Sequence, residues 1–113
     1  MTPANLDITI YQGATWRLPM QWVVNNVPVD LTGYTLRAQA KLTFNSNDQR
    51  TLFDLTAVIT DAVNGMFEIS LTSEETAAFD FIRGSWELEA VQPNADILRI
   101  LQGYVSLSRG VEP

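Results

Sequence analysis

The stretch from Tyr34 to Thr43 alternates apolar and polar side chains without a break. A period of two over this length predicts a β-strand with one buried and one solvated face. The segment before it, Asp30-Leu31-Thr32-Gly33, predicts a turn, because the Asp and Thr side chains can bond nearby backbone groups and Gly33 can adopt a positive φ. This stretch therefore specifies a turn and a strand register, and it contains no catalytic motif.

Further segments typical of β-strands recur along the rest of the chain. They are residues 6–10, 16–22, 27–29, 52–60, 66–71, 86–90 and 97–107. Turn signals separate them, and the strongest is Asn64-Gly65. Only residues 72–79 are typical of a helix, with Thr72 or Ser73 able to cap its start. We therefore predict a single domain over residues 1–113, an all-β, antiparallel immunoglobulin-like sandwich of about 7–9 short strands with one helical turn near 73–79. A small barrel is the second choice.

Three local features refine this prediction. Pro19 has no N–H to give to a ladder, so the strand over 16–22 is expected at a sheet edge. The inward phase of the last strand changes near Gly103, which predicts a β-bulge there. The polar window 44–51 is expected to be a hairpin loop. Local sequence therefore predicts one sheet edge, one β-bulge and one loop.

Composition narrows the class of function. The chain has 113 residues, 13 acidic and 7 basic, for a net charge of -6. This balance opposes binding to nucleic-acid phosphates. The absence of histidine and cysteine removes the commonest general base and all thiolate chemistry. No signal peptide and no apolar run near the ~20 residues of a membrane span are visible. We expect a non-enzymatic protein without cofactor, made in a cytoplasm, with no nucleic-acid or membrane partner.

Three groups of oxygen-bearing side chains could nevertheless form a site. Glu87 and Glu89 share a strand face about 6–7 Å apart, a separation that a glycosidase can use. The alternation around them is better explained as the solvated side of a strand. Other side chains offer oxygen ligands that calcium could use, in two loops: Asn94 and Asp96, and Asn45, Asn47 and Asp48. Asn and Asp are also ordinary turn residues, and we predict no metal.

The three tryptophans, Trp16, Trp22 and Trp86, could stack on sugar rings. Each falls on the apolar side of an alternating strand, so we predict that they belong to the core. A glycan-binding module would instead require at least one solvent-exposed tryptophan. Their exposure therefore separates these two interpretations.

A basic stripe runs along the polar side of the 34–43 strand and continues to Arg50. Ordinary solvation would explain it. The alternative is a surface complementary to the acidic 74–89 segment of a neighbouring copy, since opposite charges on one small domain suit a repeating assembly. The interface that this alternative predicts consists of Arg37, Gln39, Lys41, Arg50, Glu87 and Glu89.

Several motifs occur in a fixed order along nearly the whole chain. They are Gln12-Gly13-Ala14-Thr15-Trp16, residues 28–37 with the Asp30-Leu31-Thr32-Gly33-Tyr34 run, residues 65–76, Trp86-Glu87-Leu88 and residues 99–105. In this order they resemble the N-terminal domain of upper baseplate proteins of tailed phages, and related short virion proteins. The ordered set carries the resemblance, because each motif alone is common.

The resemblance implies an immunoglobulin-like sandwich that is made in the host cytoplasm and resides in the virion. Its expected role is that of a tail, baseplate or collar adaptor, which docks on copies of itself and on other virion proteins. Two alternatives stay open at this point. One is a capsid-decorating protein, as a cement or head-fibre component, and the other is the glycan-binding module.

Overall fold

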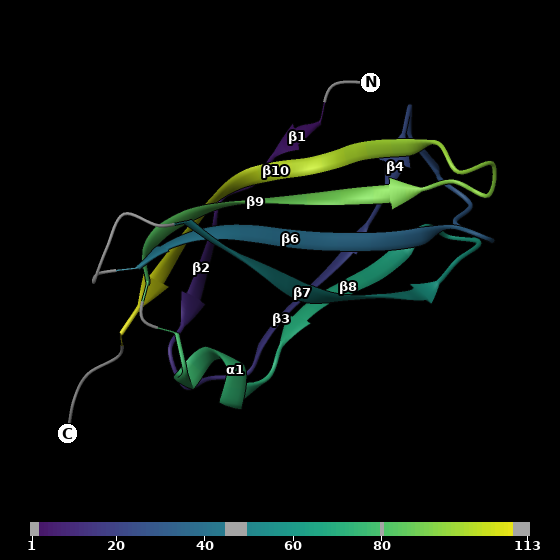
Figure 1. Ribbon diagram of the computed structural model, residues 1–113. Coiled ribbons are helices and arrows are strands. Elements are labelled where there is room, and N and C mark those ends of the chain that lie inside the picture. Colours follow the sequence, from purple (N-terminus) through teal and green to yellow (C-terminus); the bar gives the residue numbers. More distant parts are fainter. Residues whose placement is uncertain (1–2, 45–49, 80, 110–113) are drawn as a thin grey trace.

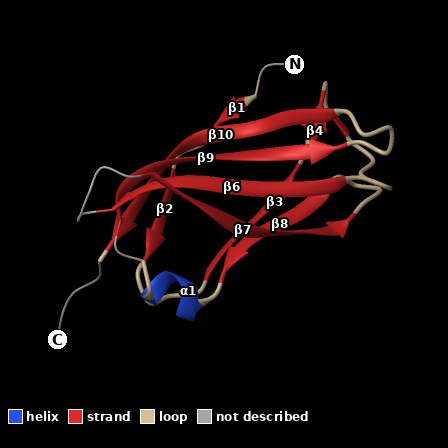
Figure 2. Ribbon diagram, viewed as in Figure 1, coloured by secondary structure: helices blue, strands red, loops and turns tan. Residues whose placement is uncertain are grey.

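The computed structural model describes residues 3–44, 50–79 and 81–109, which form ten strands and one short helix (Figures 1 and 2). The elements are β1 (Ala4–Asn5), β2 (Ile8–Tyr11), β3 (Trp16–Gln21), β4 (Val23–Val24), β5 (Val27–Pro28), β6 (Thr35–Phe44), β7 (Arg50–Asp61), β8 (Met66–Leu71), α1 (Ser73–Ala77), β9 (Phe81–Val91) and β10 (Ile97–Ser108). The all-β prediction is confirmed. Three of the ten strands have only two residues, which explains why the count exceeds the predicted range.

Strand β7 connects the two parts of the main sheet. The strand order is β1-β10-β9-β6-β7-β8-β3, and β2 also pairs with β10. Residues 50–55 of β7 pair with β6, whereas residues 56–61 pair with β8. In Figure 1, β7 runs diagonally from the β6–β9–β10 layer toward β8 and β3. The arrangement is compatible with a two-layered, immunoglobulin-like sandwich.

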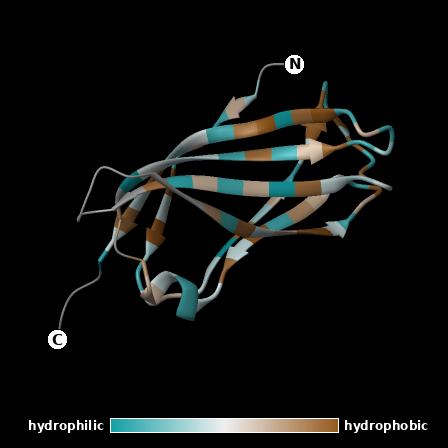
Figure 3. Cartoon of the chain, in the orientation of Figure 1, coloured by the Kyte–Doolittle hydropathy of each residue, from teal (hydrophilic) through white to brown (hydrophobic). Residues whose placement is uncertain are grey.

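The core lies between these two parts of the sheet. The alternation predicted for residues 34–43 is present in β6, where Leu36, Ala38, Ala40 and Leu42 are buried. Neighbouring β9 repeats the pattern, and its central Leu88 is fully buried. Alternating hydrophobic and hydrophilic bands are visible along β6 and β9 (Figure 3). Because β9 pairs with both β6 and β10, its buried side chains lie in the middle of the layer.

The predicted edge strand is confirmed, whereas the predicted position of the bulge is wrong. β3 pairs only with β8, so Pro19 lies in an edge strand, as predicted. The bulge in β10 lies between Arg99 and Leu101 and not at Gly103. The extra residue there, Ile100, is buried together with Leu101. The change in which side chains face inward therefore occurs earlier in the strand than the sequence indicated.

Gly103 instead allows the N-terminal segment to pass close to β10. β1 and β2 both run parallel to β10, and the chain crosses Gly103 between them. A Cβ on Gly103 would lie 2.0 Å from the Leu6 carbonyl oxygen. That oxygen accepts a hydrogen bond from Nε1 of Trp86 at 2.7 Å, and the Asp7 carboxylate accepts one from the Tyr104 N–H at 2.9 Å. The first strands are thus held to the last strand at a point where only glycine fits.

The helix and the segment after it close one end of the molecule. Thr72 caps α1 through a capping box with Glu75, which confirms the predicted helix start. Past the helix, the Phe79 ring packs edge-to-face against Phe53, at 4.9 Å between centroids, and against Phe81, at 5.4 Å. This aromatic cluster joins the connection after α1 to β7 and β9. The described part of the chain contains no helix long and apolar enough to span a membrane.

The turn before β6 has the predicted conformation. The side-chain hydroxyl of Thr32 donates to the Asp30 carboxylate at 2.6 Å, and the Thr32 N–H donates to it at 2.9 Å. These bonds hold the pKa of Asp30 below its usual value. Gly33 has a φ of +80°, as expected for the left-handed region. Of the predicted loop over 44–51, residue 44 belongs to β6 and residues 50–51 belong to β7, and residues 45–49 lie outside the described residues.

Replacing Gly33 with valine is expected to lower the free energy of unfolding by more than about 1 kcal/mol. The β-branched side chain is strained at this φ, and its Cβ would meet Pro93 Cγ at 3.0 Å. Urea denaturation of Gly33→Val measures the loss. Gly33→Asn is the control and should lose less, because asparagine tolerates the left-handed region. A near-zero loss for valine would show that the turn does not constrain the fold.

Candidate interaction surface

Three neighbouring strands present an ordered polar surface, which we call the outer face. It consists of the side chains of β6, β9 and β10 that point away from the core. The strand registers align these side chains in three rows across the sheet: Arg37, Glu89 and Arg99; Gln39, Glu87 and Gln102; and Lys41, Ser85 and Tyr104. Two of the rows place an acidic side chain of β9 between longer polar side chains of its neighbours.

One ion pair lies within the first row, and a second joins the first row to the second. Arg37 Nη2 lies 3.0 Å from Glu89 Oε1, and Arg99 Nη2 lies 2.8 Å from Glu87 Oε2. Both arginine side chains are about half exposed, at 51% and 49%. Exposed pairs of this kind contribute only about 0–1 kcal/mol each to stability. Their main effect here is to fix the direction of four long side chains on one surface.

Amide groups extend this order to both sides of the outer face. Gln39 Nε2 donates to Asp54 Oδ1 of β7 at 3.0 Å. On the opposite side, Gln102 Nε2 donates to Asn5 Oδ1 of β1 at 3.4 Å. The central rows are therefore connected from β7 to the N-terminal strand, and a partner would meet side chains that are already oriented.

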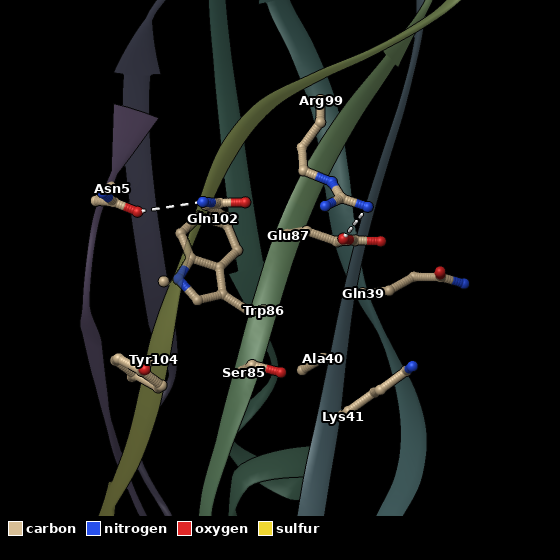
Figure 4. A pocket seen from close by; sticks show the side chains of 11 residues that line it. Asn5, Gln39, Ala40, Lys41, Ser85, Trp86, Glu87, Arg99, Gln102 and Tyr104 are labelled. Carbon is tan, nitrogen blue, oxygen red and sulfur yellow. Dashed lines mark hydrogen bonds and ion pairs between the residues drawn. The ribbon is translucent and has the colours of Figure 1, made fainter. Parts of the chain in front are cut away.

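A groove of about 680 Å³ lies on the outer face (Figure 4). At one part of it the small Ser85 lies between two large side chains, Tyr104 on β10 and Lys41 on β6. We call this part the Ser85 hollow. Tyr104 is 71% exposed, the highest value among the large hydrophobic side chains of the described residues. Lys41 has no ion-pair partner within the described ranges. The hollow thus offers an aromatic wall and an unneutralised ammonium group.

The structure brings five of the six predicted interface residues onto this single surface. They are Arg37, Gln39, Lys41, Glu87 and Glu89. Arg50 begins β7, and its side chain lies outside the described part. Glu89 pairs with Arg37 of the same copy, so these two opposite charges already neutralise each other on one face. Cross-strand register, which local periodicity does not reveal, makes them neighbours.

Three contributors to the surface were missed from sequence: Arg99, Gln102 and Tyr104. All three lie on β10, on either side of the bulge at Ile100. Alternation counted through Ile100 assigns the wrong side to one half of the strand. The signal that could have found Tyr104 was its place directly before Val105, which is buried, because neighbouring residues of a strand point to opposite faces.

The other candidate sites have their own outcomes. Glu87 and Glu89 each bind an arginine. Within the described residues, no group of three His, Cys, Asp or Glu side chains could hold a metal ion. Asn94 and Asp96 bond each other within a hairpin turn, at 3.3 Å and 3.0 Å. The second proposed calcium set, Asn45, Asn47 and Asp48, lies outside the described residues.

The tryptophans occupy the core or its margin. Trp86 is 2% exposed, which confirms its predicted core position. Trp16 and Trp22 are partly buried and pack against the core. The solvent-exposed tryptophan that a glycan-binding module would require is therefore missing, since all three lie in the described part of the chain.

A β domain whose outer face is ordered by ion pairs and amides has the character of a structural binding module. The model of the BppU N-terminal domain family matches residues 2–80, more than half of the chain, and the chain therefore belongs to this family. It is a structural protein of the tailed-phage baseplate and thus a virion component. The motifs over 86–88 and 99–105 lie beyond the matched range. No curated protein matches the chain significantly.

Proposed function

We propose that this chain is a non-enzymatic adaptor of the phage baseplate, which joins virion proteins through its outer face. The observation that carries this proposal is the pair of cross-strand ion pairs, Arg37–Glu89 and Arg99–Glu87, beside an open groove. Such pairs add little to the stability of the domain, but they pre-orient a broad surface. A partner that binds this surface would lose less side-chain entropy than one that binds an unordered surface.

The chemistry of the outer face supports docking over catalysis. Its acids are neutralised by arginine or bonded to an amide, and the chain has no histidine or cysteine to act as base or nucleophile. Arginine and tyrosine, which dominate the binding energy of many protein interfaces, are both present on it. The partners are accordingly protein surfaces of the virion, including other copies of the chain.

The location of the chain in the intact particle tests this role directly. A cryo-EM map of the virion is expected to place the domain in the baseplate, at the tail end, with its outer face against a neighbouring protein. Density confined to the head would overturn the proposal and favour the capsid-decorating alternative. Density in the baseplate with the outer face in solvent would reject this docking surface while leaving the baseplate role intact.

Replacing Arg37 with glutamate is expected to weaken assembly more than folding. The variant places a third acid beside Glu87 and Glu89, so like charges repel where an ion pair was present. The free energy of unfolding should fall by about 1 kcal/mol or less, whereas incorporation into purified particles should drop severalfold. Mass spectrometry of the particles and urea denaturation of the isolated chain measure the two effects.

Arg17→Glu is the matched control for this experiment. Arg17 is exposed on β3, in the other part of the sheet. Its replacement with glutamate therefore makes the same change of charge at a site away from the outer face. Its incorporation should stay close to that of the unchanged chain. If Arg37→Glu unfolds the monomer, Arg37 is a folding residue and the outer-face proposal is wrong.

A further inference from the structure

The end of the molecule away from the Ser85 hollow carries acidic side chains, whereas the hollow carries the ammonium group of Lys41. Three turns meet there: residues 30–33, 61–65 and 92–96. The Leu31 N–H donates to the Ala62 carbonyl at 2.7 Å, and a Cβ on Gly33 would lie 3.0 Å from Pro93. We call this region the turn end. Each turn carries one carboxylate, and these belong to Asp30, Asp61 and Asp96. None of the three turns contains a basic residue.

The turn end also exposes an apolar side chain. Val63 is 66% exposed, and only Tyr104 has a higher value among the large hydrophobic side chains of the described residues. Asp61, two residues before it, accepts a hydrogen bond from the Asn64 amide at 2.9 Å and has no ion-pair partner in the described ranges. The exposed Val63 side chain is thus two residues from the Asp61 carboxylate, which no cation neutralises in the described ranges.

This combination complements the Ser85 hollow. The hollow pairs an exposed aromatic ring with a free ammonium group, and the turn end pairs an exposed valine with a free carboxylate. Lys41 is six residues along β6 from Thr35, at the start of the strand, so the two regions are roughly 20 Å apart within one copy. They cannot meet in the same molecule, and the complementary turn end must come from another.

We propose that the Ser85 hollow binds the turn end of a second copy of this chain, with Val63 against Tyr104 and Asp61 against Lys41. This inference rests on the proposed function, since it names one occupant of the outer face. The contact is heterologous: each copy uses one surface to bind and a different surface to be bound. Repetition of such a contact gives a ring if the rotation closes, and an open chain of copies if it does not.

The opposite charges allow a test by charge exchange. Lys41→Glu places like charges at the contact from one side, and Asp61→Lys does so from the other. Each variant alone is expected to raise the dissociation constant of self-association by about tenfold or more. A mixture of the two restores opposite charges in both directions of contact, and the double variant Lys41→Glu/Asp61→Lys restores them within one chain. Both are expected to recover most of the lost association.

Sedimentation velocity over a wide concentration range measures these effects on the purified full chain. Circular dichroism of each variant checks that the monomer stays folded. Arg17→Glu, which makes the same charge change on β3, should leave the association unchanged. Recovery in the mixture and in the double variant would support the contact. Failure of both to recover, or an unchanged chain that is monomeric throughout, would overturn it.

These outcomes separate this inference from the adaptor role. An unchanged chain that is monomeric in solution but enters the baseplate through its outer face rejects self-docking and keeps the proposed function. In that case the occupant of the hollow is a different virion protein. A chain that self-associates through the predicted contact but is missing from the baseplate rejects the adaptor role and keeps the contact.

Discussion

Replacing Gly103 with alanine is expected to lower the free energy of unfolding by about 3 kcal/mol, at the upper end of the range for overpacking. The new methyl would lie 2.0 Å from the Leu6 carbonyl oxygen, far closer than van der Waals contact allows. The N-terminal segment must then leave β10, and the Trp86 N–H loses its acceptor in a buried site. Detachment of β2 would also expose Ile8 and Ile10, which are buried in the core.

Gly13→Ala is the control for this variant. Gly13 also requires special backbone freedom, with a φ of +84°, but a Cβ there would meet nothing within 4 Å. Its cost should be that of the left-handed conformation alone, about 1–2 kcal/mol. Urea denaturation of both variants compares a steric clash with backbone strain. Equal losses would show that the N-terminal segment does not depend on the close approach at Gly103.

Replacing Phe79 with alanine is expected to cost about 3–5 kcal/mol of unfolding free energy. The ring is 5% exposed and makes both edge-to-face contacts of the aromatic cluster. Its removal leaves a cavity between Phe53 and Phe81, where the connection after α1 joins β7 and β9. Thermal and urea denaturation both measure the loss, and the midpoint should fall without a change in the native far-ultraviolet spectrum at low temperature.

Phe79→Leu separates volume from aromatic geometry. Leucine fills much of the cavity but lacks the ring edge, so its cost should be about 1.5 kcal/mol, close to the value of a lost aromatic pair. A loss of less than this for alanine would show that the cluster relaxes around the cavity. The cluster would then fill space at this end of the molecule without linking β7 to β9.

Local patterns predicted those features that depend on neighbours in sequence. Alternation placed Leu36 and Leu42 in the core, and Gly33 was expected at positive φ because of the turn residues around it. The start of the helix was expected at Thr72 or Ser73 for the same reason, and Thr72 is the cap. In each case the pattern that carries the prediction lies within a short stretch of chain, so spacing and residue type were sufficient.

Features that depend on the pairing of distant strands were not predictable in this way. The pairing of Arg37 with Glu89 requires the β6–β9 register, which joins residues 52 positions apart. Tyr104 was assigned to no surface, because the bulge at Ile100 resets the alternation of β10. The role of Gly103 depends on a backbone crossing from Leu6, nearly the whole chain away. Five residues of the outer face were therefore named from sequence, but the three on β10 and the arrangement across the strands were not.

The pairing of the first strands with the last one has a consequence for synthesis. β2 requires residues 105–108 as its partner, so this edge cannot form while those residues are still in the ribosome. Until then, Ile8 and Ile10 have no place in the core, and the nascent chain holds an unpaired β-edge that other chains could join. Contacts between distant residues also slow folding, to about milliseconds to seconds for β-sandwiches. The domain thus becomes native only after residues 105–108 have left the ribosome, and its copies cannot begin to assemble before then.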